Sequence, residues 1–535
     1  MTDTLVVGPI LVALGSVLAA LVLRRYPRLQ RAVSVLGAVA YAGVVAVAVW
    51  RVVLGPTAPG IAAYQVGNWP APFGITLVLD GLSAFMLVVA AAVTLPAVAL
   101  STRFIDRENQ RVFYHPLFHL LVLGVTGAFL TGDLFNLFVW FEVMLMTSYV
   151  FVSFYGNAQH TAAAFRYLTL NVVGSATFLL AVGGLYAVTG TLNMADMSRR
   201  LADASAYGVD PAPVVGLSAL LFATFALKAG LVPFQFWVPG AYRAAPLPVA
   251  AMLAGATKKV GVYAIIRLYF TVFAGAAIPF GVPFVEGASP LVVLAPVLAT
   301  MAVLSILVGG LGAVASPSLE ELFAYSSIGQ VGFIAAPVAV AAAAGSDTVR
   351  RLGLVAALVY ALHHALAKGL LFLSAATVRG ATGTNRIAEL GGLGRQAPLL
   401  SGAVFVGALS LTGIPPLSGF FGKFLVFDAV ATHLAASPTF GTGVVLAALL
   451  VGATLTVVYV TRAWIGSFWG VRSERVRTAS VDPAQVAVLV AVAGVIVLVG
   501  LGFEPVAQFA GTAAEAAMDR GAYVEAVAPV GGGAA

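Results

Sequence analysis

The sequence predicts an all-α membrane protein with about 14 transmembrane helices. Of its 535 residues, 61% are hydrophobic and only 9% are charged, whereas soluble domains carry about 25% charged residues. Apolar runs of about 20 residues, each long enough to cross a bilayer, recur along the whole chain. No block of soluble-domain composition interrupts them, so we expect one membrane domain. The lack of cysteine excludes disulfides, thiol catalysis and cysteine metal sites.

The apolar runs, separated by Gly, Pro and Arg, place each helix to within a few residues. The helices are expected at residues 4–23, 32–54, 75–100, 113–131, 133–155, 165–190, 214–237, 246–273, 290–313, 320–344, 352–378, 398–431, 441–468 and 484–504. We divide the chain into an N-terminal three-helix segment (1–111), a core (112–480), and a last helix with its tail (481–535). The tail after Glu504 is rich in alanine and glycine, and we expect it to be flexible.

Arginines indicate the orientation of the helices. The first, third, eleventh and thirteenth loops hold most of them: Arg24, Arg25, Arg28, Arg31, Arg103, Arg107, Arg111, Arg379, Arg386, Arg395, Arg472, Arg475 and Arg477. By the positive-inside rule these odd-numbered loops are cytoplasmic. Both termini then lie on the outer side of a multi-pass inner-membrane protein. The net charge of +7 is explained by this topology, so we expect no nucleic-acid partner.

Two of the expected helices contain proline breaks. Helix 7 carries Pro233 and Pro239 near its end, and helix 12 carries the pair Pro415 and Pro416. Proline removes a backbone donor, and such breaks persist at membrane depth only inside protein or beside a wet cavity. Because the breaks are five helices apart, we expect two inverted five-helix repeats, helices 4–8 and 9–13. Ordinary proline kinks are the alternative.

Glu142 and Lys228 are the first two candidates for a site within the membrane. Both lie in strongly apolar segments, where a charge costs at least a few kcal/mol and indicates function. Burial disfavours a charged amine and a nearby carboxylate favours it. A Glu–Lys pair that opens and closes can therefore take up and release a proton. The alternative is a static structural ion pair.

Lys258 and Lys259 lie side by side in helix 8, and neighbouring residues point about 100° apart on a helix. We therefore expect only one of them, Lys259 in our assignment, to face a shared path, and the other to reach the surface or a neighbouring subunit. Sequence alone leaves open which one does so.

Helices 11 and 12 supply the remaining candidates. His364 and Lys368 are four residues apart and share a helix face, and histidine relays protons near neutral pH. His363 is adjacent, and a hydrogen-bonded structural role is the alternative for either histidine. Lys423 follows the break in helix 12. Too few ligands surround these groups for a metal site, and no phosphate-binding or catalytic motif occurs, so we expect no cofactor.

Four other titratable residues are assigned structural roles. Asp80 and Asp133 start helices 3 and 5, where the helix dipole favours a carboxylate. His115 and His119 lie near the predicted cytoplasmic end of helix 4. For these histidines a part in proton uptake is the alternative.

Long motifs surround the candidate residues. Glu142 lies in LTGDLFNLFVWFEVML, Lys228 in FALKAGLVPFQFWVPGAY, Lys259 in PLPVAAMLAGATKKVGVYAIIRLY, Lys368 in LHHALAKGLLFLSAA and Lys423 in LTGIPPLSGFFGKF, with LEELFAYSSIGQVGF at 319–333. In these motifs, residues 64–470 resemble the antiporter-like subunits shared by Mrp-type Na⁺/H⁺ antiporters, respiratory complex I and membrane-bound hydrogenases. The stretch YQVGNWPAPFGITLVLDGLSAFML at 64–87 resembles the D-type antiporter subunits more than their respiratory relatives.

The resemblance implies a role for each candidate. Glu142 and Lys228 would form the switch pair; Lys259, His364 and Lys368 would line a hydrated central axis; and Lys423 would be the terminal lysine. Where many relatives carry basic residues before AYSS, this chain has Glu320 and Glu321, which puts a local lipid or subunit contact in doubt.

The function expected is that of a subunit of a cation/proton antiporter, exchanging Na⁺ or K⁺ for H⁺ together with other membrane subunits. It would be a secondary transporter subunit and not an enzyme. The alternative is a proton-pumping subunit of a complex I-like oxidoreductase or hydrogenase, which would use the same charged residues. A third possibility is a membrane scaffold with vestigial charges.

The predicted topology can be tested with fused reporters. A reporter placed after Arg475 should be cytoplasmic, and one placed after Ala535 should be external, because an even number of helices returns the chain to its starting side. Activity of each reporter in intact cells gives the measurement. The opposite pattern would remove both the orientation and the fourteen-helix prediction.

Overall fold

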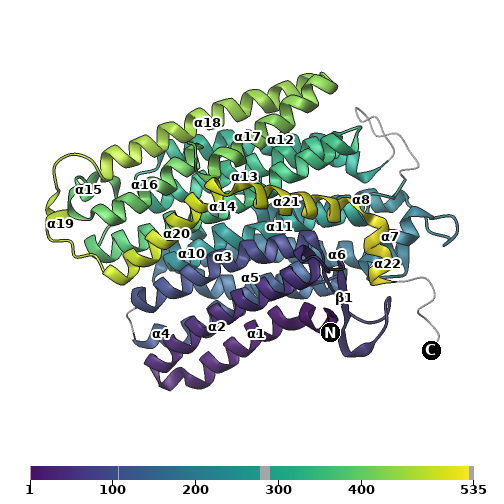
Figure 1. Cartoon of the computed structure of the whole chain (residues 1–535), viewed down its shortest axis with the longest axis horizontal. Helices are drawn as coiled ribbons and strands as arrows, with labels where there is room; N and C mark the ends of the chain where they lie inside the picture. The colour runs from purple at the N-terminus through teal and green to yellow at the C-terminus, as the bar shows by residue number, and fades with distance from the viewer. Residues whose placement is uncertain (1, 106–107, 278–288, 529–535) are drawn as a thin grey trace.

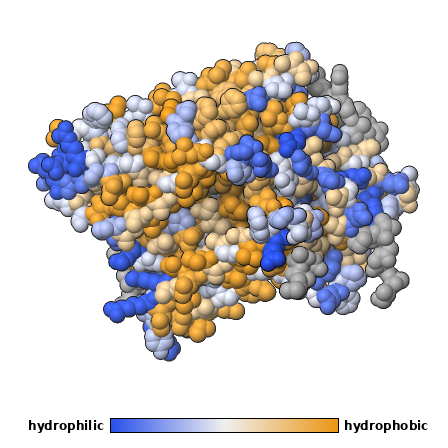
Figure 2. Space-filling view, in the orientation of Figure 1, coloured by the Kyte–Doolittle hydropathy of each residue, from blue (hydrophilic) through white to orange (hydrophobic). Residues whose placement is uncertain are grey.

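The computed structural model describes residues 2–105, 108–277 and 289–528. Within them, fourteen helical spans are long and apolar enough to cross a membrane, which confirms the predicted fold class. The long helices lie side by side (Figure 1). Figure 2 shows hydrophobic surface over the middle of the bundle and hydrophilic residues gathered toward its ends, the pattern expected when a bilayer surrounds the middle.

The spans follow in chain order. The first seven are α1 (Thr2–Val22), α2 (Pro27–Val49), α3 (Gly81–Phe104), α4 (Glu108–Leu130), α5 (Leu134–Val152), α6 (Ala158–Thr189) and α8 (Ala212–Ala229) with α9 (Trp237–Ala244). Helix 8 is built from α10 (Leu247–Met252), α11 (Lys258–Ile266) and two π-helical turns, Leu253–Thr257 and Arg267–Val272. The rest are α12 (Pro290–Ala315), α13 (Leu319–Ala343), α14 (Asp347–Thr382), α16 (Pro398–Thr412) with α17 (Ser418–Ala436), α18 (Phe440–Ser467) and α20 (Pro483–Leu501).

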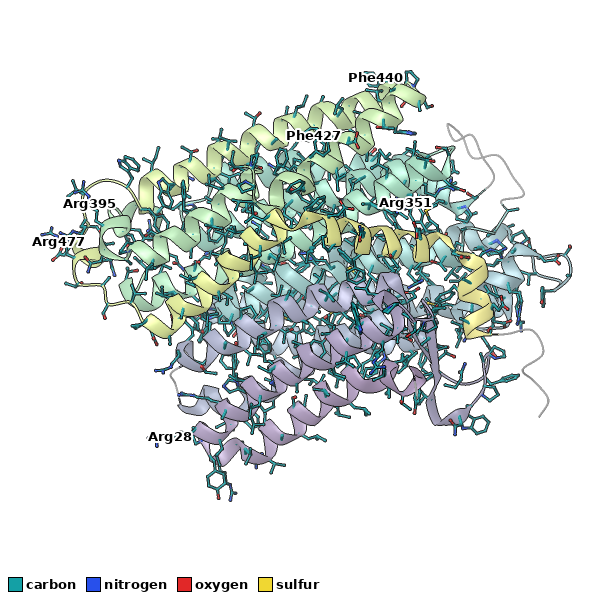
Figure 3. The ribbon with its side chains drawn as sticks, viewed as in Figure 1. Arg28, Arg351, Arg395, Phe427, Phe440 and Arg477 are labelled. Atoms are coloured by element: carbon teal, nitrogen blue, oxygen red, sulfur yellow. The ribbon has the colours of Figure 1, made fainter. Side chains whose placement is uncertain are left out.

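Arginines of the odd-numbered loops gather at one end of the bundle. Arg28, Arg395 and Arg477 all lie there (Figure 3), together with the short helices α15 (Leu393–Gln396) and α19 (Glu474–Arg477). The start of α1 and the last described residues, which end at 528, lie toward the opposite end (Figure 1). Arg107 lies outside the described residues. The grouping agrees with the predicted topology, while the side of the cell that each end faces stays a prediction.

Helix 3 begins later than expected because a hairpin precedes it. Strand β1 (Ala62–Gln65) pairs antiparallel with β2 (Thr76–Leu79), so residues expected in the helix are extended. Asp80 then caps α3, accepting a hydrogen bond from the Ser83 backbone N–H at 2.9 Å. The predicted structural role of Asp80 at the start of this helix is thereby confirmed, and it takes the form of a cap.

The prediction of a flexible tail is wrong for the described part of that segment. Residues after the last span form α21 (Phe503–Met518) and α22 (Arg520–Val527). Ala510, Ala513, Ala514 and Ala517 are fully buried. Alanine has the highest helix propensity, and the spacing of these four alanines forms one stripe along a helix. The alanine and glycine content therefore suggested a flexible tail, whereas the periodicity of the alanines indicates a packed helix. Residues 529–535 lie outside the described part.

The tail helices cover an ion pair at the end of helix 8. Arg267 donates to both carboxylate oxygens of Asp80, at 2.7 and 2.6 Å. The Tyr523 ring of α22 lies over the guanidinium, 4.8 Å from ring centroid to Cζ. Nearby, the Thr271 hydroxyl donates to the Ala517 carbonyl of α21 at 2.8 Å. The last elements of the chain therefore complete the packing of a central helix.

Candidate functional site

Glu142 and Lys228 lie on α5 and α8 and do not touch. No ion pair within 4.0 Å joins them among the described side chains. Glu142 is half-buried and accepts a hydrogen bond from Ser175 of α6. Lys228 is fully buried, and its Nζ donates to the Tyr167 hydroxyl, also of α6, at 3.3 Å. Helix α6 thus connects the two residues that the sequence suggested as a pair.

Aromatic rings enclose the Lys228 amine. Its Nζ lies 5.9 Å from the ring centroids of Phe141 and Tyr167 and 5.8 Å from that of Trp237. The Trp237 indole stacks on Tyr167 at 4.8 Å between centroids and donates to the Leu227 carbonyl at 2.9 Å. Ring faces attract a cation, so this enclosure offsets part of the cost of removing the amine from water, without a carboxylate in contact.

Helices 7 and 12 end their first halves in the same way. Gly230 and Gly413 adopt left-handed backbone conformations, with φ of +70° and +92°. The N–H of the next residue bonds to a carbonyl five residues back in each case, Leu231 to Ala226 and Ile414 to Leu409, both at 3.1 Å. This is a Schellman motif, which favours glycine because it carries no Cβ. The break falls in the fourth helix of each of the two predicted five-helix repeats.

Each break faces a lysine, which comes from helix 8 at the first break and from the second half of helix 12 itself at the second. A Cβ on Gly230 would lie 3.1 Å from Nζ of Lys258, and one on Gly413 would lie 2.9 Å from Cδ of Lys423. The Lys423 Nζ donates to the Thr412 carbonyl at 2.9 Å. The carbonyl end of a helix carries partial negative charge, so both breaks present favourable surroundings for an amine.

Lys258 and Lys259 are both fully buried, so the expectation that one of them reaches the surface is wrong. The most apolar 18-residue stretch of helix 8 is buried on every side, which leaves no outward face. The Lys259 Nζ lies 2.5 Å from Nδ1 of His364 on α14 and donates to the Ala254 carbonyl at 2.6 Å. The Lys258 Nζ donates to the Ser327 carbonyl of α13 at 3.4 Å. The two amines therefore face different neighbours, one toward helix 7 and one toward helix 11.

The candidates on α14 diverge in a similar way. His364 faces Lys259, whereas His363 faces helix 12, with its Nδ1 3.3 Å from the Ser410 hydroxyl and 3.4 Å from that of Ser418. The Nε2 atoms of both histidines are buried without a partner among the described residues. Lys368 donates to the Phe323 carbonyl of α13 at 3.1 Å and to the Ser326 hydroxyl.

All the basic candidates are buried inside the bundle, but the structure joins only some of them directly. Lys259 and His364 are in contact; Lys228, Lys368 and Lys423 each bind a carbonyl or hydroxyl instead. Sequence reasoning left Lys258 and His363 out of the site, although each is adjacent to a residue it chose. It also missed Tyr167 and Ser175, which carry no charge and therefore gave no signal in an apolar helix.

The other titratable residues have structural partners. The Asp133 carboxylate caps α5, accepting a hydrogen bond from the backbone N–H of Asn136 at 2.7 Å, which confirms its structural role at the helix start. Nδ1 of His115 and Nε2 of His119 lie 3.0 and 2.9 Å from the same Ser34 hydroxyl of α2. No group of three or more possible metal ligands occurs in the described part of the chain.

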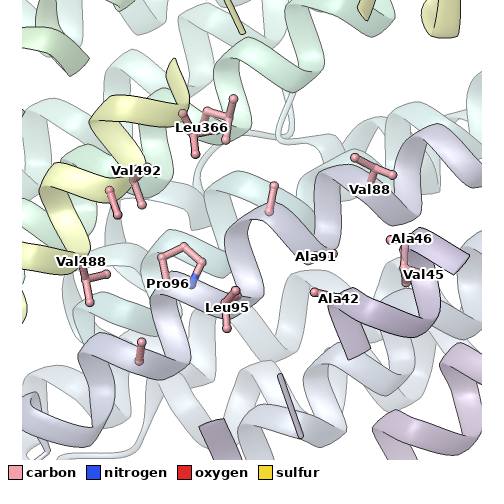
Figure 4. A pocket seen from close by; sticks show the side chains of 14 residues that line it. Ala42, Val45, Ala46, Val88, Ala91, Leu95, Pro96, Leu366, Val488 and Val492 are labelled. Atoms are coloured by element: carbon pink, nitrogen blue, oxygen red, sulfur yellow. The ribbon is translucent and has the colours of Figure 1, made fainter. Parts of the chain in front are cut away.

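An apolar pocket of about 480 Å³ lies between α2, α3, α14 and α20 (Figure 4). Its lining includes Val45, Val88, Leu366 and Val492 but no titratable side chain. The pocket is therefore lined by none of the candidate site residues.

Comparisons with known proteins agree with this geometry. The family described as "NADH:quinone oxidoreductase/Mrp antiporter, TM" matches residues 131–451. The chain is 33% identical over 470 residues to the D subunit of a Na⁺/H⁺ antiporter of Alkalihalophilus pseudofirmus, covering 88% of both chains. It is 36% identical over 503 residues to the D subunit of a probable K⁺/H⁺ antiporter of Rhizobium meliloti, covering 87% of both. It is 36% identical over 404 residues to the N subunit of an NADH-quinone oxidoreductase of Desulforudis audaxviator, covering 75% of this chain and 74% of that one.

Solved structures give the same result. A chain of the Mrp complex from Dietzia sp. DQ12-45-1b superposes with a TM-score of 0.84 at 28% identity, covering 98% of this chain and 99% of that one. A chain of an archaeal membrane-bound sulfane sulfur reductase superposes with a TM-score of 0.84 at 26% identity, with the same coverage. Antiporter and respiratory complexes thus share this fold.

Replacing Gly413 tests the geometry of the helix 12 break. Gly413→Ala should lower the thermal stability of the purified protein, because a left-handed alanine costs about 1–2 kcal/mol and its Cβ would press on Lys423. Gly402→Ala is the matched control, since that site lies in the helix before the break and has open space around it. There alanine should be neutral or stabilising by about 0.5–1 kcal/mol. Equal melting temperatures for the two variants would contradict the described break.

Proposed function

We propose that this chain, a member of the NADH:quinone oxidoreductase/Mrp antiporter family, is the D-type subunit of a multi-subunit cation/proton antiporter. Its relatives named as D subunits of Na⁺/H⁺ and probable K⁺/H⁺ antiporters support this reading over most of the chain's length. Protons would cross the bundle through its buried lysines and histidines. It is a subunit of a secondary transporter and catalyses no chemical reaction.

The observation that carries the proposal is the distribution of basic residues. The chain has only five lysines, Lys228, Lys258, Lys259, Lys368 and Lys423, and every one is buried within the bundle. None has a carboxylate within 4.0 Å in the described part of the chain. Several unpaired ammonium ions cannot share such an interior, so some of these amines must be neutral and able to accept a proton.

Arginine occupies the other basic positions, and the two residue types differ in the property that matters. A guanidinium stays charged under all ordinary conditions, whereas a buried amine can lose its proton. The fully buried Arg267 of the central helix is held by Asp80 at 2.6 Å. Residues that can exchange protons thus line the interior, whereas this permanent charge is neutralised by a carboxylate.

We assign the roles in chain order. Glu142 and Lys228 form the switch, coupled across α6. Lys258, Lys259, His364 and Lys368 form the central axis, in which only the Lys259–His364 contact is direct among the described side chains. Lys423 is the terminal group beside the helix 12 break. Water or side-chain motion must bridge the remaining gaps.

Partners and location follow from the same reading. We infer that the chain lies in the cell membrane with both termini outside and binds other subunits of an antiporter complex. H⁺ and Na⁺ or K⁺ would be the transported ions. A pumping subunit of a redox-driven complex is the second candidate, favoured by the match to the N subunit of an NADH-quinone oxidoreductase. The two relatives named as antiporter D subunits, which cover more of the chain, favour antiport.

A double-mutant cycle tests the switch. Glu142→Ala and Lys228→Ala should each abolish cation/proton exchange, and the double variant should be no worse than either, because residues acting as one unit are not additive. Glu142→Asp should keep part of the activity, since the charge remains. Exchange is measured as dissipation of a pH gradient on Na⁺ or K⁺ addition to vesicles carrying the whole complex. Glu504→Ala, at an exposed carboxylate, is the control. Wild-type exchange by either single variant in an assembled complex would exclude the switch.

Lys258 can be tested in the same vesicles. Lys258→Met keeps the approximate length of the side chain but removes the exchangeable proton. The rate of cation/proton exchange should fall at least about tenfold, because one proton-transfer group usually contributes a factor of about 10²–10⁴. Lys259→Met should have a comparable effect. Arg395→Met, at the arginine-rich end, serves as the control. Should Lys258→Met transport like wild type, Lys258 would be a structural residue that fills the space beside Gly230.

A further inference from the structure

A polar cavity of about 590 Å³ lies at the arginine-rich end of the bundle. Its walls come from the start of α6, from α9, from the start of α13 and from the end of α14. The charged and histidine side chains that line it are His160, Arg166, Arg243, Glu320, Glu321 and Arg379. The proposed proton carriers do not include them.

Two of the three arginines in this cavity have acidic partners. Arg243 lies 3.3 Å from Glu321, and Arg379 lies 4.0 Å from Glu320. Glu320 also accepts a hydrogen bond from Asn385 at 2.5 Å. The acidic pair before AYSS is therefore neutralised within the protein.

Arg166 is the uncompensated charge of this cavity. It is exposed, and no carboxylate lies within 4.0 Å of it among the described residues. Because the two glutamates are already paired, the cavity retains one net positive charge. An arginine fork matches the oxygens of a phosphate group in geometry.

The surface beside Arg166 is apolar and continues into the membrane region. Leu170, Val173 and Leu180 follow on the same face of α6, and Val173 and Leu180 are 63% and 67% exposed. From Arg166 to Leu180 the helix rises about 21 Å, enough to accompany an acyl chain through one leaflet of about 15 Å. At the rim of the cavity, Phe236 is 74% exposed.

We propose that this cavity binds the headgroup of an anionic phospholipid. The phosphodiester binds Arg166 at the mouth, and one acyl chain lies along Leu170, Val173 and Leu180. A free phosphate would use the arginine but not the apolar stripe. Basic pockets between spans at the membrane surface commonly hold anionic lipids. This inference does not depend on which ions the protein transports.

Lipid retention by the purified complex tests the proposal. The complex is washed in detergent, and bound phosphatidylglycerol and cardiolipin are counted by native mass spectrometry. Arg166→Gln should reduce retention about fivefold, the effect of one basic residue near the surface. Arg28→Gln, an exposed arginine at the same end, should leave it unchanged.

Three further experiments distinguish a bound lipid from a free anion or a protein subunit. Val173→Ser should also lower lipid retention, and inorganic phosphate should not displace the lipid. Displacement by inorganic phosphate, with no effect of Val173→Ser, would replace the lipid by a free anion. A photocrosslinker at position 166 that captures another subunit would replace it by a protein partner. Equal retention by Arg166→Gln and Arg28→Gln would overturn the proposal outright.

Discussion

The cost of removing a lysine amine from water is the constraint on which the interior of this bundle depends. An ammonium ion loses strong hydration on burial, and only oriented dipoles, ring faces or an opposite charge can offset that loss. In this bundle the lysine amines contact oriented carbonyl dipoles and ring faces. Carbonyl groups receive the amines of Lys259, Lys368 and Lys423, and three rings surround that of Lys228. None of these contacts fixes the charge as firmly as a carboxylate would, so the proton remains exchangeable.

The broken helices also supply polar groups that stabilise the buried amines. An unbroken helix uses its carbonyl groups internally, and only its last turn leaves them free. Because α8 and α16 end in the middle of the bundle, their free carbonyl groups lie in the interior and not at the surface. These helix ends lie beside Lys258 and Lys423. The π-helical turn before Lys258 likewise departs from regular helical hydrogen bonding beside a residue that we propose carries protons. Irregular backbone thus occurs where an amine needs a partner.

Much of this arrangement could be predicted, and the failures share a cause. Apolar run length indicated the spans, and the cost of buried charge identified Glu142, Lys228, His364, Lys368 and Lys423. Periodicity within one helix could not show that helix 8 is surrounded on all sides, so one of Lys258 and Lys259 was expected to leave the bundle interior. The hairpin at Ala62–Gln65 and Thr76–Leu79 and the packing of α21 depend on contacts between distant segments. Tyr167 and Ser175 carry no charge, and only the fold shows that they connect Glu142 to Lys228.

The cover over the Asp80–Arg267 pair has a consequence for biosynthesis. A ribosome that has made residues 1–501 has supplied every membrane-crossing segment of the described chain, yet the guanidinium in helix 8 still lacks the Tyr523 ring that lies over it. Helix α22 therefore finishes a structure begun far upstream, at Asp80. A chain that ended before α22 would keep all these spans but leave the ion pair without its aromatic cover. Proteases and chaperones that recognise uncovered charged groups would thereby distinguish chains that carry α22 from chains that lack it.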